Sequence, residues 1–181
     1  EPTVLESIDV YDVQFAGFNG EPVRAWLRVP HGAAGPLACV VEFVGYGGGR
    51  GEAHENLPWA GAGFAHLHLD TRGQGASWSR GGTPDGAGSA GPQVPGVMTR
   101  GILDPQTYYY RRLITDAVRA VQAARELTVV DPDRVAVTGI SQGGGVTLAV
   151  AGLCPDVRAA VVRVPFLSDF PRALQITDAY P

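Results

Sequence analysis

Residues 135–149 read Val135-Ala136-Val137-Thr138-Gly139-Ile140-Ser141-Gln142-Gly143-Gly144-Gly145-Val146-Thr147-Leu148-Ala149, and this stretch decides the fold. An apolar, β-branched run is followed by a Gly-x-Ser-x-Gly turn and then by a helix start built from small residues. That order predicts a nucleophile elbow, which exposes the Ser141 hydroxyl at the carboxyl end of a strand. Gly139 and Gly143 leave room for the helix to pass close to the strand. The unpaired first amides of the helix would favour an oxyanion beside the serine.

The Gly-x-Ser-x-Gly pattern is weak by itself, because the chain holds 25 glycines and short motifs arise by chance. Its surroundings make it stronger. Asp131-Pro132-Asp133 is a turn signal before the strand, and residues 146–153 are apolar enough for a buried helix. We therefore favour a nucleophile over a glycine-rich helix start of purely structural use.

Length, composition and charge limit the classes of protein that fit. The 181 residues predict one domain over residues 1–181, 45% of them are hydrophobic, and no apolar run approaches the length of a membrane span. A net charge of -4 argues against nucleic acid as a partner. All 14 basic residues are arginine, which excludes a Schiff-base lysine and a Walker A loop. Cys39 and Cys154 are expected to be buried free thiols.

The remaining elements predict an α/β fold with a mainly parallel sheet and helices on both faces. Residues 3–16 and 22–29 read as two strands joined at Asn19-Gly20, so residues 1–36 form a β-hairpin region. Residues 37–181 form the core. Its further strands are expected at 37–44, 64–69 and 158–164, with a short helix near 55–61 and a long loop at about 71–104.

A longer helix is predicted from Asp104-Pro105, as cap and first turn, to about Leu127. Its apolar stripe at helical spacing consists of Tyr110, Leu113, Ile114, Ala117, Val118, Val121 and Ala124. The side chains expected to face water are Arg111, Arg112, Asp116, Arg119 and Arg125.

A second glycine-rich loop, Gly45-Tyr46-Gly47-Gly48-Gly49-Arg50-Gly51, follows the strand predicted at 37–44. It occupies the place where an α/β-hydrolase supplies its second oxyanion amide. We favour that role over a plain turn. The predicted donors are the backbone amides of Tyr46 and of Gln142, the residue directly after the serine.

Two other patterns favour structural interpretations. His66, His68 and Asp70 alternate along one strand and would point to one face, but they would spread over roughly 13 Å at strand rise, too far to share one metal ion. Packed core histidines are favoured, and no metal or other cofactor is expected. Residues 86–91 match a dinucleotide fingerprint as text, yet follow no strand, so a loop is favoured.

The sequence after Ser141 lacks the histidine base and the matching acid that a serine nucleophile is expected to have there. A serine nucleophile needs a histidine base, and in this fold the acid and the histidine follow the serine. His31, His54, His66 and His68 all precede Ser141. Asp156, Asp169 and Asp178 follow it, but none comes after a further core strand. The sequence is therefore expected to be an incomplete hydrolase domain, truncated before its last strands, whose remainder carries the acid and the base.

The chain resembles carbohydrate esterase family seven, the acetyl xylan esterases and cephalosporin C deacetylases. The resemblance runs through nearly the whole chain. Its most specific marks are Arg72-Gly73-Gln74 and the Gly139-Ile140-Ser141-Gln142-Gly143 elbow. The others are the loop at 45–51, Asp70-Thr71, Thr83-Pro84-Asp85, Pro95-Gly96-Val97-Met98-Thr99-Arg100-Gly101-Ile102-Leu103-Asp104, Tyr108-Tyr109-Tyr110-Arg111-Arg112 and Val164-Pro165-Phe166-Leu167.

The resemblance implies an α/β-hydrolase that removes acetyl groups from short acetylated sugars and from cephalosporin C. Ser141 matches the family nucleophile, and Tyr46 and Gln142 match its oxyanion amides. It also implies a cytoplasmic, metal-independent homo-oligomer, typically a hexamer. From the charge and the lack of a long apolar run, no nucleic-acid or membrane partner is expected. Val44 departs from the pattern, since the family usually has a histidine before this Gly-Tyr pair.

Two alternatives stay open at this point. The chain is a non-catalytic module if it has lost its acid–base pair, which the lack of any histidine after Ser141 suggests. A hydrolase with peptide or thioester specificity would keep the chemistry and change the substrate.

Overall fold

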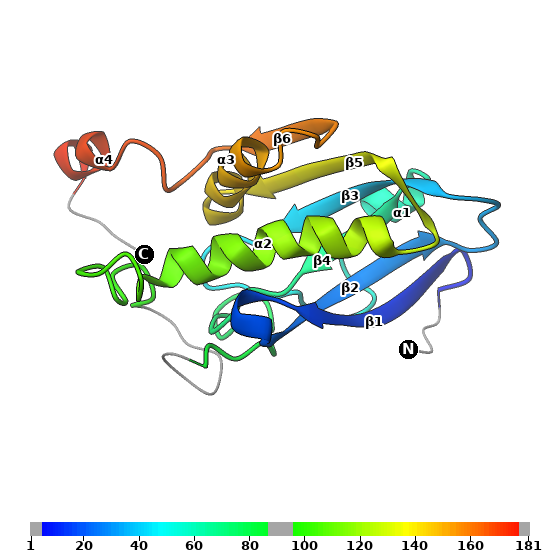
Figure 1. Ribbon diagram of the computed structural model, residues 1–181. Helices are drawn as coiled ribbons and strands as arrows, with labels where there is room; N and C mark the ends of the chain where they lie inside the picture. Colours follow the sequence, from blue (N-terminus) through cyan, green and yellow to red (C-terminus); the bar gives the residue numbers. More distant parts are fainter. Residues whose placement is uncertain (1–4, 87–95, 178–181) are drawn as a thin grey trace.

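The computed structural model describes residues 5–86 and 96–177. Its centre is a sheet with strand order β1-β2-β4-β3-β5-β6, drawn in Figure 1. The strands are β1 (Ile8–Ala16), β2 (Pro22–Pro30), β3 (Leu37–Phe43), β4 (Ala65–Leu69), β5 (Val130–Ile140) and β6 (Ala159–Arg163). The β1–β2 and β2–β4 pairs are antiparallel, whereas β4, β3, β5 and β6 run parallel. The prediction of a mainly parallel α/β sheet is confirmed.

The turn between β1 and β2 follows its sequence signal. A 3-10 turn at Phe18–Gly20 joins the two strands, which pair from Ala16 opposite Pro22. Asn19 and Gly20 have φ values of 54° and 76°, the left-handed region that Asn and Gly tolerate best. Because β2 also pairs with β4, the hairpin extends the same sheet as the parallel strands.

Helices cover both faces of the sheet, as predicted. They are α1 (Pro58–Gly61), α2 (Tyr109–Glu126), α3 (Gln142–Leu153) and α4 (Phe170–Ile176). In Figure 1, α2 crosses one face, while α1 lies behind the strands. Two apolar clusters follow from this arrangement, a large one beneath α2 and α3 and a small one beneath α1. Within the described ranges, no helix combines the length and the apolar character needed to cross a bilayer.

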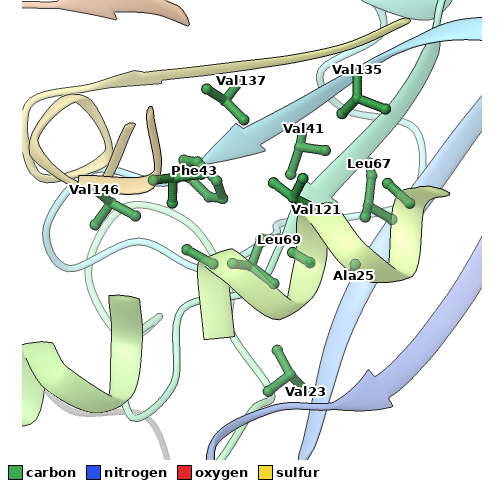
Figure 2. Packing of buried hydrophobic residues seen from close by; sticks show 14 of the residues in the cluster. Val23, Ala25, Val41, Phe43, Leu67, Leu69, Val121, Val135, Val137 and Val146 are labelled. Atoms are coloured by element: carbon green, nitrogen blue, oxygen red, sulfur yellow. The ribbon is translucent and has the colours of Figure 1, made fainter. Parts of the chain in front are cut away.

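The large cluster arises from strand alternation. Val41 and Phe43 of β3, Leu67 of β4 and Val137 of β5 point to the face that α2 covers, where Val121 of the helix meets them. Figure 2 shows these side chains together. Successive side chains of a strand point to opposite faces, so the intervening residues lie against the α1 side. The predicted apolar stripe of α2 is buried at Tyr110, Leu113, Ala117, Val121 and Ala124.

The predicted start of the long helix is wrong. The α2 helix begins at Tyr109, and Tyr108 is extended, with φ −61° and ψ 131°. Asp104 instead caps a separate turn, since its carboxylate accepts from the Gln106 amide at 2.8 Å and its carbonyl accepts from the Thr107 amide at 3.0 Å. The Asp104-Pro105 pair therefore forms a local turn that is separate from the helix.

The prediction that Arg112 and Asp116 face water is also wrong. Both lie on α2 and are buried, with exposed fractions of 3% and 0%. Arg112 binds Asp85 and Asp116 binds Arg72, both through pairs of hydrogen bonds. Charged side chains enter a core only when they are paired in this way.

The histidines of β4 are packed side chains, as favoured. His66 and His68 are buried, with ring centroids 5.5 Å apart. His66 Nε2 lies 2.9 Å from a Glu42 oxygen, and burial lowers the pKa of His68 to about 3. Asp70 accepts hydrogen bonds from the amides of Arg50 and Gly82. Cys39 and Cys154 are buried free thiols, as predicted. Most of the dinucleotide-like stretch at 86–91 lies outside the described residues.

Candidate active site

Ser141 occupies a strained turn between β5 and α3. Its φ of 57° and ψ of −119° place a residue with a Cβ in a region that L-residues avoid. Backbone hydrogen bonds hold it there: its amide donates to the Arg163 carbonyl at 3.0 Å, and its carbonyl accepts from Gly145 at 3.0 Å and Phe166 at 2.9 Å. The side chain is half-buried, and its hydroxyl has no hydrogen-bond partner among the described residues. The backbone of Ser141 is thus fixed, while its hydroxyl is left without a hydrogen bond inside the described part of the protein.

The glycines around Ser141 are required by close backbone contacts. A Cβ on Gly139 would overlap the main chain of Gly143, and one on Gly143 would overlap the Phe43 carbonyl. On the other side of the helix, a Cβ on Gly145 would overlap the Phe166 carbonyl. The glycine run therefore lets the start of α3 fit between the ends of β3 and of β6.

The second glycine-rich loop lies beside the elbow. Phe43, at the end of β3, is in register with Gly139 of β5, so the segments after these strands emerge side by side. The ideal Cβ position of Gly45 is 3.6 Å from the Ile140 carbonyl. The Tyr46 amide has no hydrogen-bond acceptor among the described residues. The Gln142 amide is the first in α3, where no intrahelical acceptor is available.

Two buried glutamines hold the loop and the elbow in register. Gln74 and Gln142 face each other as paired amides, with Gln74 Nε2 2.9 Å from Gln142 Oε1. Gln74 Oε1 accepts from the Gly47 amide at 2.7 Å, and Gln142 Nε2 donates to the Val44 carbonyl at 3.3 Å. The pair thus fixes the backbone on both sides of Tyr46. We call Gln74 and Gln142 the amide pair.

Two tyrosines from the start of α2 complete the hydrogen bonds of the amide pair. Tyr110 donates to Gln142 Oε1 at 2.9 Å, and Gln74 Nε2 donates to the Tyr109 hydroxyl at 2.9 Å. Tyr109 in turn donates to the Arg72 carbonyl at 2.6 Å. Burial raises the pKa of both phenols, so they remain neutral donors. The α2 helix begins at Tyr109 and not at the predicted Asp104, and this start places both tyrosine hydroxyls in the hydrogen-bond network.

An ion cluster lies next to the amide pair. Arg72 is fully buried and binds Asp116 through two nitrogens and Glu21 at 2.6 Å. Asp85 accepts two hydrogen bonds from Arg112, at 2.8 and 2.7 Å, and lies 3.5 Å from Arg72. Burial opposes the charge of Arg72, but Asp116 and Glu21 outweigh it and hold the Arg72 pKa above its ordinary value.

The residue between Arg72 and Gln74 has to be glycine because of its backbone conformation and its close neighbour Asp85. Its φ is 67°, and a Cβ there would lie 2.9 Å from the Asp85 Cβ. This conformation lets Arg72 reach the ion cluster while Gln74 reaches the amide pair. Residues 72–74 thus take part in both the ion cluster and the amide pair, which lie next to each other.

Sequence reasoning missed several residues that build the site. Arg112 and Asp116 have helical i, i+4 spacing, which reads as a solvated salt bridge, and nothing local shows that each pairs elsewhere. Asp85 and Trp78 lie in a loop without periodicity. Asp85 and Arg112 fall within stretches that carry the family resemblance, and Trp78 closely follows the Arg72-Gly73-Gln74 motif, but no local signal shows what each of them contacts.

The structure does not bring a histidine to Ser141. His31 binds Asp9, His66 binds Glu42 and His68 contacts Asn56. None of the four histidines forms a hydrogen bond with Ser141 in the part of the chain that is described. Of the later aspartates, Asp156 pairs with Arg125 at 2.6 Å and Asp169 caps α4; Asp178 lies outside the described residues.

Comparisons with known proteins agree on one family. A family profile described as acetyl xylan esterase (AXE1) matches residues 2–181. The acetyl xylan esterase from Paenibacillus sp. R4 is 42% identical with a TM-score of 0.89, over 100% of this chain and 56% of that one. Acetyl xylan esterase 1 from Thermoanaerobacterium sp. JW/SL YS485 is 32% identical with a TM-score of 0.84, over 97% and 54% of the two chains.

A curated relative agrees over a shorter stretch. The acetyl esterase Axe7A of Xylanibacter ruminicola is 40% identical over 74 residues, which are 41% of this chain and 17% of that protein. The chain spans about half the length of the two solved structures, at 56% and 54%. The chain has the α/β-hydrolase fold of these structures, with a mixed sheet and a strand–serine–helix elbow.

The glycine contacts predict opposite effects for two alanine substitutions in α3. Gly143→Ala should lower the free energy of unfolding by about 1–3 kcal/mol, because its Cβ would overlap the Phe43 carbonyl. Gly152→Ala is the matched control: no atom lies within 4 Å of its added Cβ, so it should stabilise the helix by about 0.5–1 kcal/mol. Urea unfolding of the intact protein measures both, and effects of the same sign would contradict the close approach of α3 to β3.

The ion cluster predicts how stability depends on pH. Burial would raise the pKa of Asp85, but Arg112, Arg100 and Arg72 hold it below its ordinary value. A lowered folded-state pKa stabilises the protein above the unfolded value, near pH 4, and this contribution is lost as pH falls through the folded value. Asp85→Asn should therefore cost about 3–5 kcal/mol at pH 7 by leaving buried arginine unpaired, and less in acid.

Chemical unfolding at pH 7 and at pH 3 measures this difference for Asp85→Asn and for an exposed control, Glu126→Gln. The control should change stability by less than about 0.5 kcal/mol. A cost for Asp85→Asn that is the same at both pH values would show that the charge of Asp85 does not stabilise the fold.

Proposed function

The chain belongs to the acetyl xylan esterase family, and on that premise we propose that it carries the nucleophile of a serine esterase that removes acetyl groups from acetylated xylo-oligosaccharides and cephalosporin C. The observation that carries this proposal is the Ser141 elbow. A serine with φ of 57° holds an unbonded, half-buried hydroxyl at the start of a helix. Backbone strain of this kind persists at functional sites, where the surrounding structure over-determines it.

In the proposed reaction, Ser141 Oγ attacks the acetyl carbonyl carbon while a histidine takes its proton. The carbonyl oxygen becomes negative, and the amides of Tyr46 and Gln142 donate to it. Donors of this type stabilise the transition state, and the loss of one costs on the order of a hundred- to a thousandfold in turnover. When the intermediate collapses, the sugar oxygen takes the proton and leaves. Water then attacks acetyl-Ser141 and releases acetate.

The amide pair supports the proposed role of the two donors. An oxyanion site is effective when its donors are held in place before the reaction, so that no reorganisation is needed. Gln142 binds the Val44 carbonyl before Tyr46 and Gln74 binds the Gly47 amide after it, and Gln142 itself supplies the second amide. The donors are therefore positioned by fully buried side chains and not by loop conformation alone.

The histidine and its acid are proposed to lie outside this sequence, because the described histidines are engaged elsewhere or apart from Ser141. A non-catalytic module is not favoured, since the relatives above are named as esterases. The resemblance noted in the sequence adds the proposals of a cytoplasmic location, no metal or other cofactor, and a homo-oligomer of hexameric type; sedimentation of the intact protein would test the oligomeric state.

Replacing the nucleophile tests the proposed function. Ser141→Ala in the intact protein should lower kcat for p-nitrophenyl acetate by at least about a thousandfold, since no acyl-enzyme can form. Ser7→Ala, at an exposed serine directly before the edge strand β1, should keep full activity. Hydrolysis at the unchanged rate by Ser141→Ala would refute the serine mechanism.

Acyl length gives a second test. We propose acetyl as the preferred acyl group, because the family acts on acetyl esters. The intact protein should hydrolyse p-nitrophenyl acetate at least about tenfold faster than the octanoyl ester, measured as kcat/KM. Equal rates on the two esters would contradict an acetyl-sized site.

A further inference from the structure

The most exposed tryptophan of the chain lies beside the proposed oxyanion loop. Trp78 is 62% exposed, although large aromatic side chains usually bury most of their surface. Its indole is nevertheless fixed in place, because Nε1 donates to the Tyr46 carbonyl at 2.8 Å. The ring therefore presents an open face to solvent without the freedom of an ordinary surface side chain.

The backbone around Trp78 is also fixed to the same loop. The Ser77 amide donates to the Gly47 carbonyl at 3.2 Å, and the Gly49 amide donates to the Ser79 carbonyl at 3.0 Å. The Ser79 hydroxyl adds a bond to the Gly49 carbonyl at 3.0 Å. The segment that carries Trp78 and the segment that carries the proposed donor Tyr46 therefore form one hydrogen-bonded unit.

The glycines of the loop make room for the indole. A Cβ on Gly48 would lie within the contact distance of three ring atoms of Trp78. Gly45 has the same neighbour, with its ideal Cβ position 3.5 Å from Trp78 Cζ2. Close approach of backbone to an aromatic ring is thus a reason for glycine in this loop that the oxyanion role alone does not supply.

Trp78 is also near the nucleophile. The same ideal Cβ position on Gly45 lies 3.6 Å from the Ile140 carbonyl, one residue before Ser141. A single glycine therefore separates the edge of the indole from the end of β5. An ester bound at Ser141 would have Trp78 within reach of the part of the substrate that extends past the loop.

We propose that Trp78 is a binding platform for the leaving alcohol, on which a pyranose ring of the acetylated sugar stacks while its acetyl group reacts at Ser141. This inference rests on the proposed function and names a residue that would select the alcohol. A pyranose has an apolar face of C–H groups, which suits the electron-rich face of an indole, and stacking removes apolar surface of both from water. The methyl of an acetyl group is too small to need such a surface.

A rigid platform also favours binding energetically. The indole is already ordered by its bond to the Tyr46 carbonyl, so a sugar that binds there does not have to immobilise it. Because Tyr46 is also the proposed oxyanion donor, the platform and the donor belong to two segments that hydrogen bonds hold together. That hydrogen-bonded unit would place the sugar ring and the reacting carbonyl relative to each other.

The test compares substrates with and without a ring in the alcohol. Trp78→Ala in the intact protein should lower kcat/KM for acetylated xylobiose by about five- to twentyfold, mostly through KM. The same variant should lower kcat/KM for methyl acetate by a smaller factor, that of the lost indole bond to the Tyr46 carbonyl alone, because methanol has nothing to stack. Trp78→Phe keeps an aromatic face and should retain most of the activity on the sugar ester.

The matched control is Tyr11→Ala, which removes an aromatic side chain, 51% exposed, from β1. It should leave both substrates unaffected. An equal loss on methyl acetate and on the sugar ester in Trp78→Ala would assign Trp78 to holding the loop, and no loss on either would remove it from the site. A loss in Trp78→Ala that depends on acyl length would place the indole beside the acyl group. Each of these three results would overturn the proposal.

A direct binding measurement covers the case in which Trp78→Ala fails to fold. Titration of xylobiose into the Ser141→Ala protein should change tryptophan fluorescence, and Trp78→Phe in that background should abolish the change. An unchanged signal in Trp78→Phe would contradict the platform. If the intact protein hydrolyses neither ester, the proposed function fails; if it hydrolyses both and Trp78 makes no difference between them, only this inference fails.

Discussion

The paired amides of Gln74 and Gln142 are the contact on which the site depends. They are fully buried, and each side chain must satisfy its donors and acceptor within the protein. They do so by binding backbone of the loop after β3, hydroxyls at the start of α2, and each other. One pair of side chains thus joins four segments that are far apart in the sequence. A buried network of this kind specifies a single arrangement, because a partly satisfied one would be costly.

The ion cluster gives this arrangement a second support. Arg72 belongs to both networks, since its carbonyl accepts from Tyr109 and its guanidinium binds Asp116. The long connection between β4 and α2 is therefore held at several points along its described residues, although it forms no helix or regular strand there. Paired charges give the cluster stability that would be lost if one partner were removed. The two amides proposed as oxyanion donors are therefore held by the core of the domain.

Glycine has a different physical reason in each part of the site. At the elbow, Gly139 and Gly143 allow helix and strand backbones to touch. At Gly73, a positive φ directs the side chains of Arg72 and Gln74 to different hydrogen-bond networks. At Gly48, the missing Cβ leaves space for the Trp78 indole. Glycine in the site thus lets backbone approach backbone or an aromatic ring, whereas glycines such as Gly20 and Gly152 have no atom within 4 Å of an added Cβ.

The sequence alone determined the order of the elements, the elbow at Ser141, the Asn19-Gly20 turn and the burial of the β4 histidines, because hydrophobic period and turn chemistry act between near neighbours. It also indicated the loop at Tyr46 and the family. Only the tertiary structure decided that α2 starts at Tyr109, that Arg112 and Asp116 are buried, and that Trp78 lies against the loop. Each of these depends on a partner tens of residues away. A local pattern shows which side chains are charged or apolar, but whether a charge is solvated or paired depends on what the fold places opposite it.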